Sequence, residues 1–518
     1  MAHAGGAQAV GDYGTHHELV EQLIPDAELA PRSVDDVIKL PSFLSKIRQC
    51  EQLLGRRYAE VDHAVQDALV LRRLQQLVHT LMLNPLWNER IRRAGLSGAP
   101  RSFEEWQKVP ITDKQGMEAL FMRNRPGMVV PLNRGGFQIV ASGGTSSGSP
   151  VEAVYPIREL HDTYALAGEF MGNYILAEHL AGQQPKWVIT TLADYQMWSS
   201  GTMVGGVLQN IPGINYIGAG PIRKELFQHI LSYEGKKAFM AISRGIAIMT
   251  DLGAGLGRTE RESFHVALYG SGLLPHRKRV ELTEIYPNLQ ILSYFAATQA
   301  ETIGLQRTPD SYLAGVPGLH LVEIVDEQGR WVAEGEEGEL VVTRLLGHEA
   351  PFPRFKVGDR MIRRPNLDGP GLKTRQFEFA GRSGDVIHLA DTQYSAPRAY
   401  EAICQELYAR GIMDLKALAH EFQFLNDRTK STLTLLAAVD TADWPTMRVA
   451  SGLGEPGVRH VFIQALIRSL SLYNLGDATP ESIERAGYRF VLRFVTRQSP
   501  EIHRTEVGKV PIIRDIFG

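Results

Sequence analysis

The densest glycine cluster in this sequence is SGGTSSGSP, residues 142–150. It lies between two apolar runs, FQIVAS (137–142) and VEAVYP (151–156), whose composition predicts β-strands. Backbone N–H groups and hydroxyls in such a loop can surround phosphate oxygens. A flexible connector is the other interpretation of the same composition, so the context of the loop has to decide between the two.

Two better-known motifs match this loop only in part. The spacing of Gly143 and Gly148 fits the first half of a Walker A loop, but Ser149 occupies the lysine position. The run GTSSG (144–148) matches the nucleophile elbow of serine hydrolases, which requires a helix directly after the serine. Pro150 and a strand-like run follow instead. The sequence therefore favours a phosphate-binding loop between two strands.

The composition is that of a globular protein, with 518 residues, 44% hydrophobic and 22% charged. The formal net charge is −3, so no basic excess favours binding to nucleic acid. Cys50 and Cys404 are too far apart for a disulfide framework or a zinc motif, which favours a reducing compartment. The sequence has no apolar run of ~18 residues and no basic start followed by an apolar stretch. We expect a cytoplasmic protein without a membrane span or a signal peptide.

Changes in residue pattern divide the chain into three parts. Residues 1–80 form a helical extension, because apolar residues recur there at helical spacing. Residues 81–383 are expected to form a large α/β body of layered sheets and helices. Residues 384–518 follow as a small C-terminal α+β domain.

In the large body, strand-like runs alternate with helical stretches, a pattern typical of largely parallel sheets. The expected strands are 137–142, 151–156, 186–192, 214–220, 264–270 and 289–295, and the expected helices are 157–180, 222–233 and 275–286. Residues 321–345 are expected to be antiparallel strands with their first turn at 327–329. In the C-terminal part, 431–439 and 489–496 are β-rich.

The glycine loop resembles the phosphate loop of the adenylate-forming ligases, a superfamily of acyl-CoA synthetases, peptide-synthetase adenylation domains and luciferases. Five further motifs of that superfamily have counterparts in this chain, in the family's order. They are YFAATQ (294–299), GELVVT (338–343), RFKVGD (354–359), GRSGD (381–385) and RTEVGK (504–509). The resemblance covers about residues 80–518 and implies that the small C-terminal domain is mobile.

The resemblance also implies which residues bind the base and phosphates of ATP. Phe295 would lie beside adenine, and Thr298 would contact the α-phosphate. The backbone of Gly270, Ser271 and Gly272 would pass close to the base, although a tight strand-to-helix turn also explains these residues. The phosphate-binding residues would be Ser142, Gly143, Gly144, Thr145, Ser146, Ser147 and Gly148.

Four further residues receive roles in the same way. Asp359 would accept hydrogen bonds from the ribose hydroxyls, and Arg382 would also reach the ribose. Lys509 would be the catalytic lysine that bridges the carboxylate and the phosphate oxygens. Gly384 would be the hinge about which the C-terminal domain turns.

Within the superfamily, the chain most resembles the phenylacetate–CoA ligase branch. NPLW (84–87) and VPITDK (109–114) resemble N-terminal segments of that branch. The resemblance implies an aromatic or arylalkyl acid as substrate. Trp198, Met203 and Val204 would line the acyl pocket, with core packing as the alternative.

Three positions depart from the family pattern. Gln299 stands where a glutamate binds Mg²⁺, so Glu301 is a substitute candidate for the metal. Gly384 replaces the usual hinge aspartate. Ala390 lies near the position of a glycine that lets CoA pass, which keeps acceptors other than CoA open.

We therefore expect a ligase that uses ATP and Mg²⁺ to convert a carboxylic acid into an acyl-adenylate. CoA is the first expectation for the acceptor, and an amine or a carrier-protein thiol is the alternative. A degenerate nucleotide-binding protein is a second class, because Gln299 departs from the motif. The oligomeric state stays open, with a homodimer as one arrangement.

Overall fold

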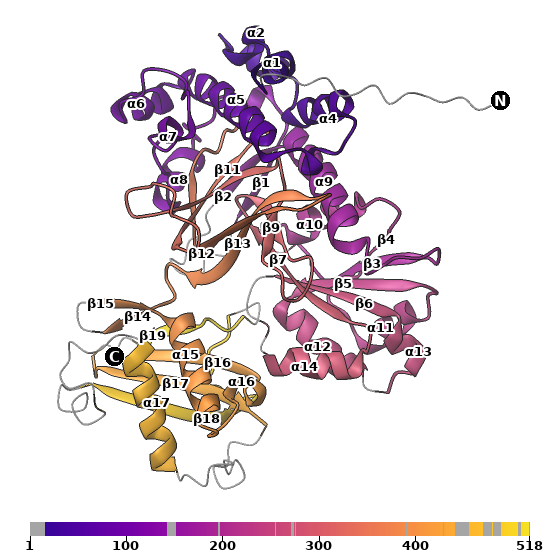
Figure 1. Cartoon of the computed structure of the whole chain (residues 1–518), viewed down its shortest axis with the longest axis vertical. Helices are drawn as coiled ribbons and strands as arrows, with labels where there is room; N and C mark the ends of the chain where they lie inside the picture. Colours follow the sequence, from indigo (N-terminus) through magenta and orange to yellow (C-terminus); the bar gives the residue numbers. More distant parts are fainter. Residues whose placement is uncertain are drawn as a thin grey trace. The chain divides into compact units, whose positions relative to one another are not determined.

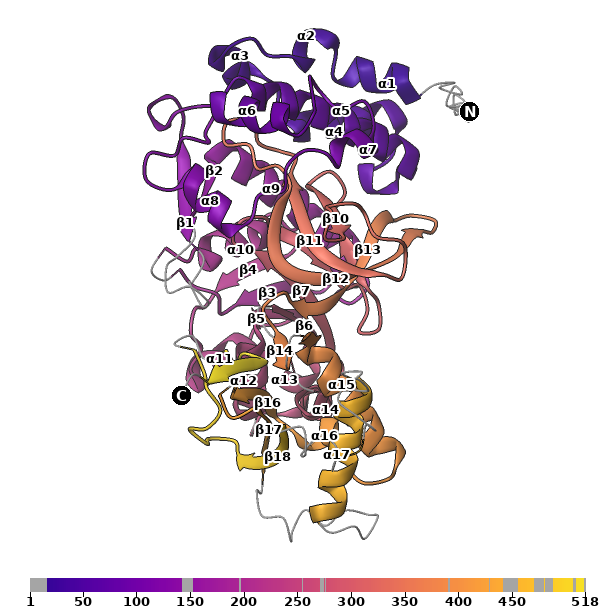
Figure 2. The ribbon, with the colours of Figure 1, turned by 90° about the vertical axis from the view of Figure 1, so that its left-hand side faces the viewer.

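The structure is a computed structural model in which the chain forms two compact units (Figures 1 and 2). Unit 1 comprises Met1–Pro221, Leu292–Val357 and Ile362–Glu378, and unit 2 comprises Ile222–Ile291, Gly358–Met361 and Phe379–Gly518. The residues that the structure describes are 16–141, 152–194, 197–253, 255–270, 274, 276–389, 392–427, 429–440, 455–469, 479, 488–505 and 509–516.

Unit 1 begins with helices that gather around α5, as Figures 1 and 2 show. Their bounds are α1 (His16–Leu23), α2 (Asp26–Leu29), α3 (Val34–Lys39), α4 (Phe43–Leu54), η1 (Tyr58–Glu60), α5 (His63–Met82), α6 (Pro85–Arg93), α7 (Phe103–Trp106) and α8 (Lys114–Phe121). Along α5, Val65, Leu69 and Leu77 are buried, so the apolar spacing correctly predicted this helix. The Asn84 side chain accepts a hydrogen bond from the Leu86 N–H (2.9 Å) and so caps the start of α6.

Seven strands of unit 1 lie side by side in the order β10-β11-β12-β13-β9-β8-β7. Their bounds are β7 (Gln290–Ala297), β8 (Glu301–Leu305), β9 (Leu313–Gly315), β10 (His320–Val325), β11 (Glu337–Arg344), β12 (Phe355–Asp368) and β13 (Lys373–Arg382). The predicted antiparallel pair at 321–345 is confirmed, since β10 pairs with β11 in opposite directions. The pairs β7–β8 and β8–β9 are also antiparallel, because connections of a few residues cannot cross over to a parallel strand.

The remaining elements of unit 1 include most of the α/β alternation that the sequence predicts. They are η2 (Leu132–Arg134), β1 (Phe137–Ala141), β2 (Glu152–Pro156), α9 (Ile157–Phe170), η3 (Met171–Leu176), β3 (Lys186–Thr190), α10 (Ser200–Gln209) and β4 (Asn215–Gly218). Here β3 and β4 are parallel, as expected, whereas β1 and β2 form an antiparallel pair. The expectation of largely parallel sheets is therefore right for β3–β4 and wrong for the β1–β2 hairpin and for β7–β9, whereas β10–β11 is antiparallel as predicted.

Unit 2 contains a second α/β segment and the C-terminal region. The segment comprises α11 (Lys224–Leu231), β5 (Lys236–Ile242), α12 (Ser243–Gly253), α13 (Arg258–Glu262), β6 (Phe264–Gly270) and α14 (His276–Ile285). Strands β5 and β6 are parallel, with Met240 opposite Leu268. The run 264–270 is β6, as predicted, whereas β5 was not expected from the sequence.

The C-terminal region is an α+β arrangement, as expected. Its elements are β14 (Val386–Leu389), β15 (Thr392–Ser395), α15 (Ala396–Ala409), α16 (Leu415–Leu418), β16 (Glu421–Asp427), β17 (Thr432–Val439), α17 (Glu455–Ser469), β18 (Arg489–Thr496) and β19 (Ile513–Ile516). The sheet order is β18-β17-β16-β19, and the two predicted strands, β17 and β18, pair in parallel. Figure 1 shows α15 and α17 side by side near this sheet, and Ile403, Phe462 and Phe424 share their core.

None of the helices among the described residues combines the length and the hydropathy that crossing a membrane would require.

Candidate active site

Several predicted site residues lie outside the described residues. They are Ser142, Gly143, Gly144, Thr145, Ser146, Ser147, Gly148, Ser271 and Gly272, together with Ala390. Their roles remain predictions. The other predicted residues are described, and those of unit 1 and those of unit 2 form separate groups.

In unit 1, the strands on both sides of the glycine loop form a hairpin. Ala141 pairs with Glu152, so the loop leaves and re-enters the fold at the same end of β1 and β2. The Ala141 N–H donates to the carbonyl of Met197 (2.9 Å), and the Tyr155 hydroxyl donates to the carbonyl of Thr298 (2.8 Å). These two bonds hold the flanks of the predicted phosphate loop against the predicted acyl-pocket segment and the predicted α-phosphate residue.

The side chain of Arg344 packs against strand β2 of the hairpin. Its guanidinium lies 4.1 Å from the centroid of the Tyr155 ring and forms a buried ion pair with Glu159 (3.1 Å). One of its nitrogens also donates to the carbonyls of Val154 (3.0 Å) and Ala350 (2.8 Å). These contacts of the Arg344 guanidinium keep the Tyr155 side chain in position to donate its hydrogen bond to Thr298.

Thr298 and Gln299 occupy a tight turn between β7 and β8. The Ala300 N–H donates to the carbonyl of Ala297 (3.0 Å), and Glu301 begins β8 with a φ of 48°. A positive φ is unusual for a residue with a side chain and indicates local strain, which is often found at functional sites. Phe295, in β7, and Thr298 are half-buried, as a contact with a nucleotide requires.

The side chains of Gln299 and Glu301 are buried in the protein interior. Their exposed fractions are 5% and 4%. Burial raises the pKa of Glu301 to about 8. The Nε2 atom of Gln299 and the Oε2 atom of Glu301 have no hydrogen-bond partner among the described residues.

This pair does not fit the Mg²⁺ site that the motif implies. Mg²⁺ binds to ionised carboxylate oxygens, but Gln299 is neutral and burial favours the neutral form of Glu301. Within the described part of the chain, no group of three or more His, Cys, Asp or Glu residues could hold a metal ion. We therefore assign no metal to this turn.

The predicted acyl-pocket residues lie on and before α10. Trp198 is half-buried, whereas Met203 and Val204 are 2% and 6% exposed. Helix α10 packs closely on Tyr164 of α9, because a Cβ atom at Gly206 would be 2.5 Å from the tyrosine ring. The burial of Met203 and Val204 agrees with core packing and with a pocket wall, so their role stays a prediction.

In unit 2, the predicted ribose residues are brought together. Asp359 lies in β12 and Arg382 ends β13, and Arg382 Nε is 3.6 Å from Asp359 Oδ1. The Ser383 N–H donates to the carbonyl of Gly358 (3.0 Å), which ties the two motifs at the backbone. Arg382 is exposed and Asp359 half-buried, so both can reach a ligand.

Lys509 joins the same group. Burial lowers its pKa to about 8, the charge of Arg382 lowers it further, and Asp359 opposes the shift. The Thr505 N–H donates to the carbonyl of Lys509 (2.9 Å), and the Lys509 N–H donates to the Thr505 hydroxyl oxygen (3.0 Å). This local ring of two bonds fixes the backbone that carries the lysine.

The predicted hinge, Gly384, lies two residues after Arg382. Gly384 is exposed, and no described atom lies within 4 Å of where its Cβ would be. Three positions earlier, Gly381 has a φ of 119°, and a Cβ there would lie 2.8 Å from Pro397 Cγ. Gly381 therefore requires glycine for its conformation, whereas Gly384 has free space around it.

Gly270 ends β6, where the sequence predicts a backbone beside adenine. The Ser243 hydroxyl donates to its carbonyl (3.4 Å), which ties the end of β6 to the start of α12. Tyr155 and Tyr164 were not predicted from the sequence. Tyr155 holds the Thr298 turn by its hydrogen bond, and the charge of Glu301 raises the pKa of Tyr164. No sequence signal marks them, because a tyrosine in an apolar strand or helix is read as core.

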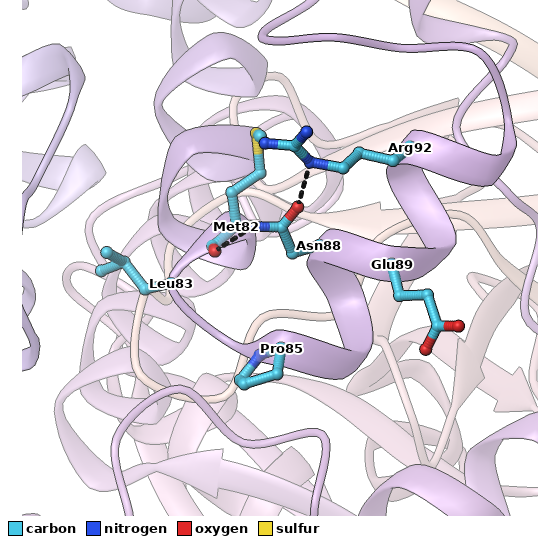
Figure 3. A pocket seen from close by; sticks show the side chains of 6 residues that line it. All are labelled: Met82, Leu83, Pro85, Asn88, Glu89 and Arg92. Carbon is cyan, nitrogen blue, oxygen red and sulfur yellow. Dashed lines mark hydrogen bonds between the residues drawn. The ribbon is translucent and has the colours of Figure 1, made fainter.

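A separate hollow at the start of α6 does not resemble this site. It encloses about 480 Å³ and is lined by Met82, Leu83, Pro85, Asn88, Glu89 and Arg92. Figure 3 shows that Asn88 donates to the carbonyl of Met82 (3.1 Å) and accepts from Arg92 (2.7 Å). Glu89 pairs with Arg93 of the same helix. The hollow therefore offers no unpartnered group that points to a ligand.

Comparison with known proteins adds evidence about the fold. No protein-family model matches the sequence, and no curated protein matches it either. Among solved structures, 2-hydroxyisobutyryl-CoA ligase with 2-HIB-AMP in the postadenylation state is similar over 88% of this chain and 91% of that chain, at 16% identity and a TM-score of 0.62. An open conformation of that ligase with 2-HIB-AMP and CoA is similar over 88% and 93%, at 14% identity and a TM-score of 0.56. The chain therefore has the fold of the adenylate-forming acyl-CoA ligases, as the glycine loop and the motif order predicted.

Proposed function

We propose that this protein is an AMP-forming ligase that activates a carboxylic acid with ATP and then transfers the acyl group. The observation that carries the proposal is the grouping of Asp359, Arg382 and Lys509, which come from three separate stretches of the chain. A lysine, an arginine and a carboxylate at one place suit a nucleotide, since the cations attract phosphate and the carboxylate accepts ribose hydroxyls. The shared fold with a ligase solved in a postadenylation state supports the same chemistry.

In the first half-reaction, a carboxylate oxygen of the acid attacks the α-phosphorus of ATP. The bond between the α-phosphorus and the bridging oxygen breaks, and pyrophosphate leaves with the electron pair. Positioning and charge neutralisation account for most of the catalysis in such a step. Lys509 would bridge the attacking carboxylate and the α-phosphate, and Thr298 would contact that phosphate from the turn that Tyr155 holds.

Asp359 and Arg382 would bind the ribose, and the loop 142–148 would surround the phosphates. Gly270 and Phe295 would lie beside adenine. We further propose that residues 81–383 form the adenylation domain and residues 384–518 the domain that carries the catalytic lysine. Residues 1–80 would be a helical extension.

In the second half-reaction, a thiol attacks the acyl carbon and AMP leaves. We propose CoA as the acceptor, because the neighbour of the same fold was solved with CoA. Rotation of the C-terminal domain about Gly384 would convert the enzyme from the first half-reaction to the second. The free space around this residue is consistent with a hinge. An amine or a carrier-protein thiol is the alternative acceptor, since Ala390 departs from the CoA-ligase pattern.

For the acid, we propose an aromatic or arylalkyl substrate, as in the phenylacetate–CoA ligase branch. Trp198 would supply an aromatic wall of the pocket, and the buried apolar side chains of Met203 and Val204 would complete it. Both cysteines are free and buried, which supports a reducing, cytoplasmic location.

ATP–pyrophosphate exchange with a panel of carboxylic acids tests the proposal. We expect ATP–pyrophosphate exchange only when an acid of one chemical class is present. No exchange with any acid, combined with binding of ATP, would instead favour a degenerate nucleotide-binding protein. AMP release that requires CoA separates CoA transfer from transfer to an amine or a carrier protein.

A further inference from the structure

Several buried side-chain atoms of unit 1 lack a hydrogen-bond partner among the described residues, and three of them belong to Gln299, Glu301 and Tyr164. The three atoms are the Nε2 of Gln299, the Oε2 of Glu301 and the hydroxyl of Tyr164. Buried polar groups in proteins are almost always paired, because leaving one unpaired costs free energy. Three such atoms near one turn therefore require an explanation.

These three side chains belong to one neighbourhood. Gln299 and Glu301 are two residues apart, on either side of Ala300. Burial raises the pKa of Tyr164, and the nearby charge of Glu301 raises it further. Tyr164 thus lies close enough to Glu301 to interact with it, although no hydrogen bond joins them in the described structure.

The neighbourhood also borders the two parts of the site that an activated acid must contact. Gln299 follows Thr298, the predicted α-phosphate residue. Tyr164 packs against α10 at Gly206, on the helix that carries Met203 and Val204. Gln299 is therefore adjacent in sequence to the predicted phosphate contact, and Tyr164 packs on the helix of the predicted acyl pocket.

The chemistry of the three atoms is complementary. An amide N–H can only donate a hydrogen bond, whereas a tyrosine hydroxyl and a neutral carboxyl group, the form that burial favours for Glu301, can each donate or accept one. A ligand group that satisfies all of them must accept from Gln299, and a group that can also donate is able to pair with the other two in either direction. An uncharged hydroxyl meets this requirement, whereas a methyl group meets none of it and an ammonium group cannot accept from Gln299.

We infer that Gln299, Glu301 and Tyr164 form a specificity site for a hydroxyl substituent on the activated acid. The inference rests on the proposed function, which it narrows to hydroxy acids. It gives the glutamine of this motif a role in substrate recognition instead of metal binding. The left-handed backbone of Glu301 is then the conformation that directs its side chain inward at the start of β8.

The test compares matched pairs of acids that differ by one hydroxyl. Mandelate and 4-hydroxyphenylacetate are each compared with phenylacetate, both in ATP–pyrophosphate exchange and in calorimetric binding of the acid in the presence of ATP. We expect one hydroxylated acid to be preferred by tenfold or more, since a site built for a hydroxyl rejects the analogue that lacks it. Tyr164→Phe and Glu301→Gln should each reduce that preference by about tenfold.

Tyr174→Phe is the matched control, because Tyr174 follows α9 and its hydroxyl already donates to Glu60 (2.8 Å). It should leave the preference unchanged. The thermal midpoint of Tyr164→Phe should equal or exceed that of the wild type, because the removed hydroxyl has no hydrogen-bond partner among the described residues. A clear loss of stability would mean that the fold itself uses this hydroxyl, and it would overturn the inference.

The outcomes also separate this inference from the proposed function. Exchange without any preference for a hydroxylated acid would overturn the inference and leave the ligase activity standing. A hydroxyl preference in binding without any exchange would support the site and contradict the activity. Loss of preference in Tyr174→Phe as well would overturn the assignment to Tyr164.

Discussion

Arg382 Nε lies 3.6 Å from Asp359 Oδ1, and the charges of both residues act on Lys509. The arginine ends β13 and the aspartate lies in β12, so neighbouring strands of the sheet hold them at a fixed separation. The lysine comes from a distant stretch of the chain. This geometry places two cations and one carboxylate at a single site in unit 2.

Replacing Lys509 by alanine should abolish adenylation and preserve the fold. A positive charge on the α-phosphate stabilises the transition state, and loss of one such contact typically costs about 100-fold or more in rate. ATP–pyrophosphate exchange measures the loss, and circular dichroism checks the fold. Lys416→Ala is the matched control, because Lys416 pairs with Glu401 in a salt bridge. Equal rates in wild type and Lys509→Ala would remove the central mechanistic assignment.

The exchange rate should fall as the pH rises through about 8. Burial and Arg382 lower the pKa of Lys509 to about 8, so the lysine loses its charge above that value. A pH profile from 6 to 10 (roughly two units on either side) measures the effect. Arg382→Gln should shift the falling limb to higher pH, since it removes a positive charge that disfavours protonation. A profile that stays flat through pH 8 would show that Lys509 does not act in its charged form.

The same pKa has a consequence for stability. The lysine binds its proton more weakly in the folded state than in the unfolded state, whose pKa is near 10.5. The unfolded state therefore holds more protons between about pH 8 and 10.5, and this group makes the fold more stable as the pH rises through that window. Lys509→Ala should lack this increment when its thermal midpoints are compared with those of the wild type from pH 7.5 to 10.5. An identical pH dependence in both proteins would contradict the lowered pKa.

Much of this site could be predicted from the sequence, because its motifs coincide with the ends of strongly apolar strands. The predicted strands at 137–142, 264–270 and 289–295 are β1, β6 and β7, and each leads into a predicted binding segment. Strand ends are marked locally by a change from β-branched and aromatic residues to glycine, serine and threonine. That signal does not depend on the rest of the fold.

Other elements could not be predicted, because distant contacts stabilise them. Helix α10 has the sequence SGTMVGGVLQ, whose three glycines lower its helix propensity. Gly201 and Gly206 are needed for close approach, since a Cβ would lie 2.8 Å from Ala193 Cα and 2.5 Å from the Tyr164 ring. Strand β5 begins with two lysines, and Lys237 is buried because its ammonium donates to the carbonyls of Tyr233 and Gly235.

The chemical role of Gln299 and Glu301 could not be predicted from the sequence for a different reason. The sequence indicates two oxygen-bearing side chains near a phosphate motif, which fits a metal site. Only the fold reveals that both are buried and that no acidic cluster surrounds them among the described residues. Burial depends on neighbours from α9 and β2, which the local sequence does not identify.

Asp359→Asn should raise the KM for ATP about 10- to 100-fold with a smaller effect on kcat. A carboxylate that accepts ribose hydroxyls forms charge-assisted hydrogen bonds, and such bonds contribute more than neutral ones. Exchange kinetics with varied ATP at saturating acid separate the two parameters. Asp326→Asn is the control, because Asp326 caps the β10–β11 turn and pairs with Arg330. A fall in kcat at unchanged KM would instead indicate that Asp359 acts in the transition state.

Gly206→Ala should destabilise the protein, although alanine favours helices by about 1 kcal/mol over glycine. The added Cβ would lie 2.5 Å from the ring of Tyr164, and forcing atoms into a packed core typically costs about 1–3 kcal/mol. The clash therefore outweighs the gain in propensity, and the displaced tyrosine should also reduce any preference for hydroxylated acids. Denaturant unfolding measures the first effect, and exchange with matched acids measures the second. Gly98→Ala is the control, because no described atom lies within 4 Å of its Cβ position. A more stable Gly206→Ala protein would mean that α9 and α10 pack less tightly than the structure indicates.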